Sequence, residues 1–315
     1  MSAILWQMVQ TLLVVALAPL LTGYVRFVKA RLNGRRGPSP LQPYRDLYRL
    51  VQKEAVVAHS ASWIFRAAPY VTFASVWLAA CIVPTFTTNM ALAPAADLIA
   101  LVALLALSRF WTALAGMDVG TSFGGLGASR EMLIASLAEP AMLMVTFSLS
   151  LVSGTTAPAQ VIAFVLAGNV GIEVSLGLAL AAMVMVAIAE NGRIPIDNPS
   201  THLELTMVHE AMVLEYSGRH LAMVEAAAMV RLTLFMALIG ALFFPWGIAQ
   251  PGAGGAGIGI GMASFLVKTL ALATALALFE TTIAKMRVFR VADFLGGALL
   301  RGLLATIFLY VSEAV

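Results

Sequence analysis

Four acidic residues within or at the ends of long apolar stretches are the side chains in this sequence best placed to carry chemistry. They are Glu139, Glu190, Glu225 and Glu280. A charge placed in hydrocarbon costs at least ~2.5–3.5 kcal/mol, so such residues usually face the interior of a helix bundle or a hydrated cavity. Carboxylates within reach of water can pass protons between them. The four residues are therefore candidates for proton transfer.

A structural role is the alternative for the same residues. Arg109 and Arg231 occur within the apolar stretches as well. They could hold some of the acids ionised, in pairs that tie helices together, and long side chains near a helix end can also reach the membrane surface. Four acids at a similar depth favour a hydrated proton path over isolated pairs. The outcome depends on whether the helices bring the acids together.

The stretches that carry these acids predict an all-α integral membrane protein. Of the 315 residues, 61% are hydrophobic and 11% are charged, against ~25% charged in an average soluble domain. Apolar runs of about 20 residues can cross a hydrocarbon core of ~30 Å as helices. The runs lack the polar face of a soluble helix, and the first lacks the basic start of a signal peptide. We expect one transmembrane domain over residues 1–315, with about eight transmembrane helices at roughly 3–25, 68–90, 95–116, 131–153, 172–190, 221–246, 258–283 and 291–312.

The distribution of positive charge predicts the orientation in the membrane. Nine of the 19 Lys and Arg residues lie between residues 26 and 66, whereas the connections on the other side carry no charge. Loops rich in Lys and Arg face the cytoplasm, so we expect a multi-pass protein of the prokaryotic cytoplasmic membrane with both termini outside. The four acids then share the cytoplasmic half of the membrane. The cytoplasmic loops are expected at approximately 26–67, 117–130, 191–220 and 284–290.

The first of these loops is expected to contain an amphipathic helix. It includes the string "RRGPSPLQPYRDLYRLVQKE" (35–54), whose prolines favour an extended or turning start. From residue 43 to 53 the pattern becomes helical. Leu47, Leu50 and Val51 form a narrow apolar face, and Arg45, Arg49 and Lys53 form a basic ridge. Such a helix suits a docked partner or a surface of lipid headgroups.

Cysteine and histidine spacing predicts neither a metal site nor a catalytic residue in this chain. Cys81 is the single cysteine, so disulfides and iron–sulfur clusters are not expected. His202 and His209 are seven residues apart, ~10 Å along a helix, and cannot share one metal ion directly. We interpret them as loop or interface residues, with proton relay as the alternative. The glycine-rich string at 120–131 lacks the ending of a phosphate-binding loop. We expect a flexible loop there, with Ser129 capping the next helix.

Three regions of the sequence resemble a known family. "RRGP" followed by "LQPYRD" and "KE" is similar to the first cytoplasmic loop of the family that contains subunit 1 of respiratory NADH dehydrogenase (complex I). "ENGRIPID" (190–197) resembles the family's Glu-x-x-Arg-x-Pro-x-Asp motif, and "LEYSG" (214–218) resembles the end of the same loop. The family also includes the membrane anchor subunits of energy-converting nickel–iron hydrogenases. Eight spans with outward termini fit the same family over nearly the whole chain.

The loop after the second motif favours the hydrogenase branch of this family. Complex I members carry a run of acids after the Pro-x-Asp, but here Ser200 and His202 follow Asp197 at the third and fifth positions. Glu204 alone keeps an acid in register, and about three extra residues precede Glu215. Formate hydrogenlyase-type subunits also keep acids there, and the string is most similar to membrane subunits of the Ech, CO-induced and hydrogenase-4 kind. The branch as a whole is that of formate hydrogenlyase, hydrogenase-4 and Ech-like membrane subunits.

The resemblance implies a membrane anchor and ion-coupling subunit, with catalysis in partner subunits. The nickel–iron site and the iron–sulfur clusters are expected in those partners, with no cofactor in this chain. The implied partners are the hydrogenase large and small subunits, antiporter-like membrane subunits and membrane lipid, and no nucleic acid. Buried carboxylates would link electron transfer to proton or sodium translocation. The quinone-chamber subunit of a complex I-like NADH:quinone oxidoreductase is the alternative. A stand-alone transporter would require an internal repeat, and no convincing repeat is present.

The resemblance also suggests roles for individual residues. Arg193 and Asp197 would organise the loop as an ion pair, together with His202 and His209. The residues that would dock the soluble partner are Arg35, Arg36, Arg45 and Arg49. The candidate proton-path residues are Glu139, Glu190, Glu204, Glu215, Glu225 and Glu280.

Overall fold

The structure is a computed structural model that describes residues 2–168, 174–193, 208–283 and 290–313. The regular elements in these ranges are helices, and the β pairing found there is an isolated bridge between Thr87 and Ala249. The helices are α1 (Ser2–Leu32), α2 (Gln42–Gln52), α3 (Trp63–Ile82), α4 (Leu98–Asp118), α5 (Ser122–Ser153), α6 (Pro158–Leu166), α7 (Val174–Glu190), α8 (His209–Val213), α9 (Gly218–Leu242), α10 (Gly255–Thr282) and α11 (Arg290–Glu313).

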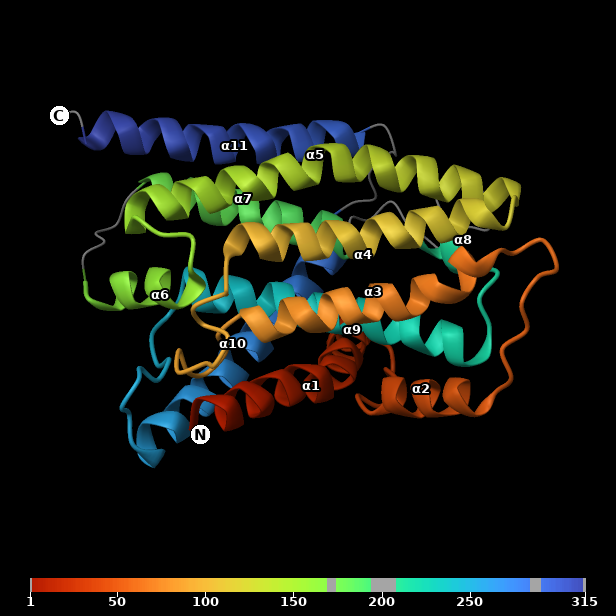
Figure 1. The fold of residues 1–315 in the computed structure, drawn as a ribbon, viewed down its shortest axis with the longest axis horizontal. Helices are drawn as coiled ribbons and strands as arrows, with labels where there is room; N and C mark the ends of the chain where they lie inside the picture. Colours follow the sequence, from red (N-terminus) through yellow and green to blue (C-terminus); the bar gives the residue numbers. More distant parts are fainter. Residues whose placement is uncertain (1, 169–173, 194–207, 284–289, 314–315) are drawn as a thin grey trace.

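Eight of these helices correspond one by one to the predicted spans. Seven of them, all but α7, are long and apolar enough to cross a membrane, and the described part of α7 is apolar over 17 residues. The prediction of an all-α, multi-pass membrane protein is confirmed. Figure 1 shows the N- and C-termini at the same end of the bundle, as an even number of crossings requires, while α2 and α8 lie at the other end, called the α2 end below.

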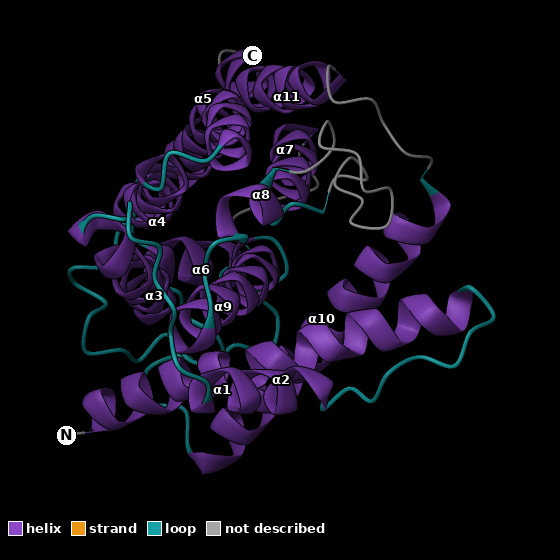
Figure 2. Cartoon of the chain, turned by 90° about the vertical axis from the view of Figure 1, so that its right-hand side faces the viewer, coloured by secondary structure: helices purple, strands orange, loops and turns teal. Residues whose placement is uncertain are grey.

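Helix α9 forms the centre of the bundle. In its most apolar stretch of 18 residues, 78% of the residues are buried, against 22% in the corresponding stretch of α10 and 28% in that of α11. A helix that is apolar on all sides is suited to such a central position. The view from the α2 end shows α1, α2 and α10 on one side of α9, and α4, α5, α7 and α11 on the other (Figure 2). Polar side chains on the inner faces of these helices are therefore shielded from lipid.

The glycine-rich string at 120–131 differs from the expected flexible loop. Helix α5 begins at Ser122, so the loop expected over 117–130 is only three residues long. Thr121 caps the first turn of the helix: its Oγ1 accepts a hydrogen bond from the Gly124 N–H at 3.2 Å. The Ser129 hydroxyl donates to the Leu126 carbonyl and caps no helix. Glycine weakens an isolated helix, but close packing overrides this preference here. A side chain on Gly124 would overlap the carbonyl of Gly116 in α4.

The expected amphipathic helix of the first loop is present as α2. It packs against α1 and α9 through Pro43, Leu47 and Leu50, but Val51, which we expected on the apolar face, is 62% exposed. The chain before α2 folds back along α1, and the Tyr44 hydroxyl donates a hydrogen bond to the Ala16 carbonyl. This contact holds α2 against the first span.

Two further contacts join the loops at the α2 end. The Tyr216 ring stacks on Phe65 with 4.0 Å between centroids, and the Tyr216 hydroxyl donates to the Phe65 carbonyl at 2.9 Å. Burial raises the pKa of this phenol, so it remains a hydrogen-bond donor. Ser217 and Val56 exchange two hydrogen bonds at 2.8 and 2.9 Å. The segment after α8 is therefore fixed to the connection between α2 and α3.

Candidate functional site

A buried arginine in α4 lies between two carboxylates from other helices. The Arg109 side chain is 2% exposed, and its Nη2 forms an ion pair with Glu190 Oε2 at the end of α7. Its Nε lies 3.3 Å from Oε1 of Glu131 in α5. Both acids are buried as residues. Three helices thus contribute one ionisable side chain each to the same group, which we call the Arg109 group (Arg109, Glu131 and Glu190).

The glycine contact between α4 and α5 explains how two of these side chains meet. The helices are antiparallel neighbours, and they come closest where Gly124 faces Gly116. Arg109 precedes Gly116 by seven residues, and Glu131 follows Gly124 by seven. Seven residues make about two helical turns, so each charged residue lies on the same face as the glycine of its helix. The close contact therefore aligns Arg109 with Glu131.

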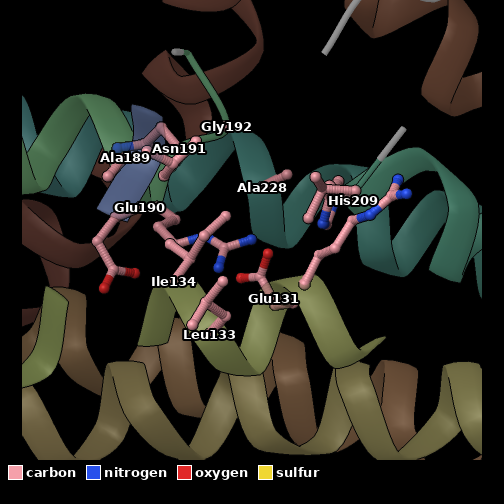
Figure 3. A pocket seen from close by; sticks show the side chains of 13 residues that line it. Glu131, Leu133, Ile134, Ala189, Glu190, Asn191, Gly192, His209 and Ala228 are labelled. Carbon is pink, nitrogen blue, oxygen red and sulfur yellow. The ribbon is translucent and has the colours of Figure 1, made fainter. Parts of the chain in front are cut away.

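A cavity of 80 Å³ adjoins the Arg109 group. Glu131, Glu190, Asn191, His209 and Arg231 are among the residues that line it, and Figure 3 shows the first four of them around the cavity. Arg231 is 5% exposed, and its Nε has no hydrogen-bond partner among the described residues. The cavity is large enough to hold water, and polar groups to bind it are present.

His209 is the first residue of α8 and lies on the wall of this cavity. Burial and then the charge of Arg231 lower the pKa of its imidazole to about 4, against the opposing effect of Glu131. The side chain is therefore neutral at pH 7. A neutral imidazole offers one donor and one acceptor nitrogen, which is the arrangement needed to pass a proton between hydrogen-bonded neighbours.

Two further cavities lie between the first cavity and α2, and each shares lining residues with the one before it. The second, of 240 Å³, shares Asn191 and His209 with the first and is also lined by Arg26 and Glu225. The third, of 210 Å³, shares Arg26 and Glu225 with the second and is lined by Asp46 of α2. We call these three spaces the cavity series. It runs from the Arg109 group, past His209 and Glu225, to the amphipathic helix.

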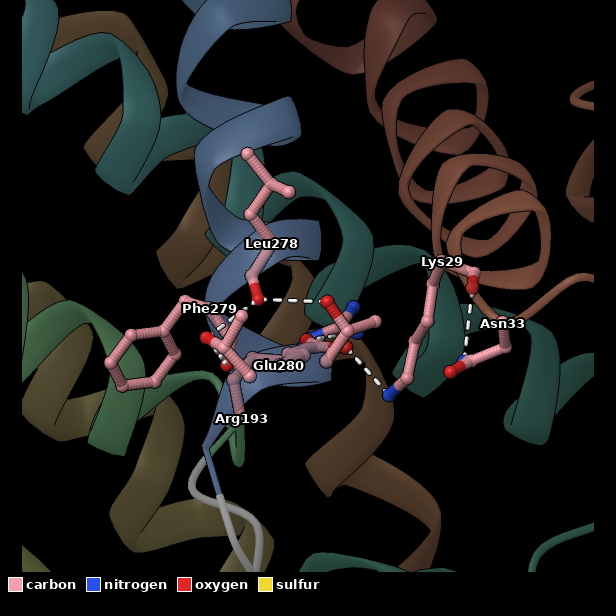
Figure 4. A network of polar contacts seen from close by, with 8 residues as sticks. Lys29, Asn33, Arg193, Leu278, Phe279 and Glu280 are labelled. Carbon is pink, nitrogen blue, oxygen red and sulfur yellow. Dashed lines mark hydrogen bonds and ion pairs between the residues drawn. The ribbon is translucent and has the colours of Figure 1, made fainter.

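A second group of charges joins α1 and α10 to Arg193, which lies three residues after the end of α7. Lys29 Nζ lies 2.8 Å from Glu280 Oε2, and Arg193 Nη1 lies 3.2 Å from Glu280 Oε1. Figure 4 shows Lys29 and Arg193 on either side of Glu280. Arg193, which also lines the second cavity, was expected to pair with Asp197. Asp197 lies outside the described residues, and the partner observed for Arg193 is Glu280.

The remaining predicted acids differ in their surroundings. Glu139 lies eight residues beyond Glu131 in α5, which is about 12 Å deeper along the helix at 1.5 Å per residue. It is partly buried and does not line the cavity series. The common depth expected of Glu139 and Glu190 stays a prediction. Glu215 is exposed after α8.

The other predicted site residues are surface residues or lie in undescribed segments. Glu204 and His202 fall outside the described residues, as Asp197 does. The four arginines expected to dock a partner are all exposed: Arg35, Arg36, Arg45 and Arg49.

Glu131 is a site residue that we did not predict. It follows the glycine-rich string, which we interpreted as a loop, and so it fell at the expected edge of a span. Its spacing from Gly124 and Gly127, seven and four residues, is helical. That spacing is the feature of the sequence that could have revealed Glu131.

Among the described residues, no group of three His, Cys, Asp or Glu side chains could hold a metal ion. Proton transfer through water and carboxylates is the chemistry that this arrangement supports.

Comparisons with known proteins agree on one family. The model of the NADH dehydrogenase family matches residues 5–311. Formate hydrogenlyase subunit 4 of Escherichia coli K12 is 32% identical over 286 residues, covering 91% of this chain and 92% of that protein. Hydrogenase-4 component C of the same organism is 36% identical over 247 residues, covering 78% and 77%.

Two further matches widen this comparison. A subunit of the NADH-quinone oxidoreductase of Rubrobacter xylanophilus is 28% identical over 244 residues, covering 73% of this chain and 71% of that protein. A chain of the membrane-bound sulfane sulfur reductase, an archaeal respiratory membrane complex, has the same fold. Its TM-score is 0.80 at 19% identity, and the match covers 96% of this chain and 98% of that one.

Proposed function

The chain belongs to the NADH dehydrogenase family, and from this premise we propose that it is the anchor and ion-coupling subunit of an energy-converting nickel–iron hydrogenase. It is a membrane subunit of a respiratory-type complex. The similarity to formate hydrogenlyase subunit 4 and hydrogenase-4 component C supports the hydrogenase type. The soluble partners would be the hydrogenase large and small subunits, which would hold the nickel–iron site and the iron–sulfur clusters. Antiporter-like membrane subunits would be its neighbours in the prokaryotic cytoplasmic membrane.

The observation that carries the coupling role is the junction between the Arg109 group and the cavity series. Glu190 is buried in the bundle, yet it borders a cavity that shares His209 with a second cavity, which Glu225 lines. A proton that enters near α2 would reach Glu225, pass His209 and water, and arrive at Glu190 or Glu131. Each step joins groups that donate and accept hydrogen bonds, as proton transfer requires. Glu139, farther along α5, would be the next carboxylate toward the interior.

The proposed docking surface lies at the same end as the entrance to the cavity series. With the basic loops on the cytoplasmic side, both termini would face outward. Arg45 and Arg49 project from α2 as exposed side chains, while the opposite face of that helix packs on α1 and α9. A partner bound to α2 would therefore border the third cavity through Asp46. Redox events in that partner could then act on the entrance of the proton path.

Substitution of Glu225 tests this function. Glu225→Gln keeps the size of the side chain but removes its exchangeable proton at the junction of the second and third cavities. In the purified complex reconstituted into liposomes, we expect electron transfer to continue and proton movement per electron to fall severalfold. Asp293→Asn, which changes an exposed acid at the start of α11, is the control. An unchanged proton yield in the Glu225 variant would contradict the proposal.

One observation supports the quinone-chamber alternative. An apolar cavity of 260 Å³ lies between α7, α9 and α10, lined by side chains such as Leu232, Phe235 and Phe279, with Arg193 at its edge. An apolar space with a polar rim is typical of a site for a lipophilic molecule. Reduction of a quinone analogue by the purified complex, with no production of hydrogen, would favour this alternative.

A further inference from the structure

Arg109 contacts two carboxylates through different nitrogen atoms. Nη2 pairs with Glu190, while Nε faces Glu131 at 3.3 Å. A guanidinium carries five N–H donors in a rigid planar fork, so one arginine can serve two acids at once. The two carboxylates come from α5 and α7, and Arg109 lies between them as their shared counter-ion.

The charges around this arginine nearly balance. Arg231, on α9, lines the same cavity, and His209 there is neutral at pH 7. Arg109 and Arg231 thus offset Glu131 and Glu190. Arg130, next to Glu131 and on the wall of the same cavity, and Glu139, eight residues beyond Glu131, add one charge of each sign. Charges in a buried site interact strongly because little water screens them. A proton added to either acid therefore changes the field at the other.

We propose that Arg109 couples the protonation of Glu131 and Glu190, so that a proton bound by one carboxylate lowers the proton affinity of the other. When one carboxylate is protonated, the guanidinium pairs more closely with the other, which then binds a proton less readily. Glu131 is thereby a positioning residue that controls when Glu190 accepts a proton. The inference rests on the proposed function only for what the coupling is used for, because the two carboxylates would be coupled even in a complex that is not turning over.

A fixed brace is the competing interpretation. In that case Arg109 would tie α4 to α5 and α7, and each carboxylate would titrate independently of the other. Coupled groups instead titrate in two steps that belong to the pair, and the interaction exceeds ~1 pH unit. Coupling is also reciprocal, so Glu131 must affect Glu190 as much as Glu190 affects Glu131. This reciprocity distinguishes the two interpretations.

Infrared spectroscopy of the purified complex during a pH titration tests the proposal. The carbonyl band of protonated carboxyl groups is assigned to each residue by difference between wild type and the Glu131→Gln or Glu190→Gln variant. Glutamine keeps the size and shape of the side chain and removes its charge. We expect each variant to move the remaining acid's midpoint to lower pH by about one unit, a tenfold loss of proton affinity. The two shifts should be equal.

A third variant isolates the role of the arginine. Arg109→Lys keeps the positive charge but replaces the fork with a compact ammonium that cannot serve both acids in the same geometry. The reciprocal shift should shrink in this background, whereas Asp293→Asn should leave it unchanged. Midpoints that do not move in either glutamine variant would overturn the proposal, even if the lysine variant fails to fold.

The result is separable from that of the proposed function. Reciprocal shifts in a complex whose Glu225 and Glu190 variants still move protons normally would support the coupling and reject the ion path. Independent titration together with impaired proton movement would support the path and reject the coupling.

Discussion

At the scale of single residues, two buried arginines set the charge that the buried acids experience. Arg109 is 2% and Arg231 is 5% exposed, and both lie in apolar helices. A buried ion pair contributes little net stability compared with apolar packing, but removal of one partner leaves an uncompensated charge. The Arg109 group is therefore better explained by what its charges do than by the stability they add.

Removal of Arg109 should be much more damaging than removal of an exposed arginine. Arg109→Met leaves Glu131 and Glu190 buried without their shared partner, which costs about 3–5 kcal/mol. Arg301→Met, in α11, removes an arginine that is exposed on the bundle surface. Denaturant titrations in detergent, followed by loss of helical circular dichroism, measure both variants. Equal losses in the two would contradict the central position of Arg109.

His209 predicts a pH dependence of stability. Its pKa is about 4 in the folded protein, against ~6.5 in an unfolded chain. The unfolded state therefore binds a proton first, and the contribution of neutral His209 to stability is complete above pH 6.5 and lost as the pH falls toward 4. His209→Gln should flatten the stability curve in that window, whereas His59→Gln, at an exposed histidine, should not. A curve that keeps its slope in the His209 variant would refute this.

At the scale of the helices, close packing between α4, α5 and α8 positions the site. Gly124 meets the carbonyl of Gly116, and Gly127 faces Ala211. Hydrophobic run length predicted the eight spans, because a stretch of about 20 apolar residues is required for each crossing. The same criterion cannot show that a glycine-rich string is helical, since the reason lies in the neighbouring helix. For this reason the sequence analysis did not identify Glu131 as a site residue.

A pair of glycine substitutions tests the packing. Gly124→Ala places a methyl group against the Gly116 carbonyl, and overpacking of this kind costs about 1–3 kcal/mol. Gly125→Ala, one residue later, meets no atom within 4 Å and should stabilise the helix by up to ~1 kcal/mol. Denaturation midpoints of the two variants are the measurement. Stabilisation by both would show that α4 and α5 are not in close contact there.

At the scale of the whole molecule, three features lie at the α2 end. They are the exposed arginines of α2, the loops joined through Tyr216 and Ser217, and the third cavity of the cavity series. Sequence alone located Glu190, Glu225 and Glu280, because an acid within an apolar run is conspicuous. It did not reveal that Glu280 pairs with Lys29 and Arg193, or that Glu139 lies apart from the cavities, since both depend on how helices far apart in the sequence pack. The roles of Glu204, Asp197 and His202 stay predictions.

The basic face of α2 should control assembly. Arg45→Gln with Arg49→Gln removes two exposed charges without altering the buried face of the helix. We expect the soluble subunits to be lost from the purified complex, and more so at high salt, because exposed charge pairs are screened. Arg45→Lys with Arg49→Lys is the charge-conserving control. Full retention of the soluble subunits together with weaker binding to anionic lipid vesicles would identify a lipid surface instead.

The central claim is that protons pass through Glu190. The most direct measurement is the number of protons moved per electron by the complex in liposomes, compared between wild type, Glu190→Gln and the Asp293→Asn control. The account predicts that Glu190→Gln assembles and transfers electrons, but that its proton-to-electron ratio falls severalfold while the control keeps the wild-type ratio. A Glu190→Gln complex with the wild-type ratio would contradict the account.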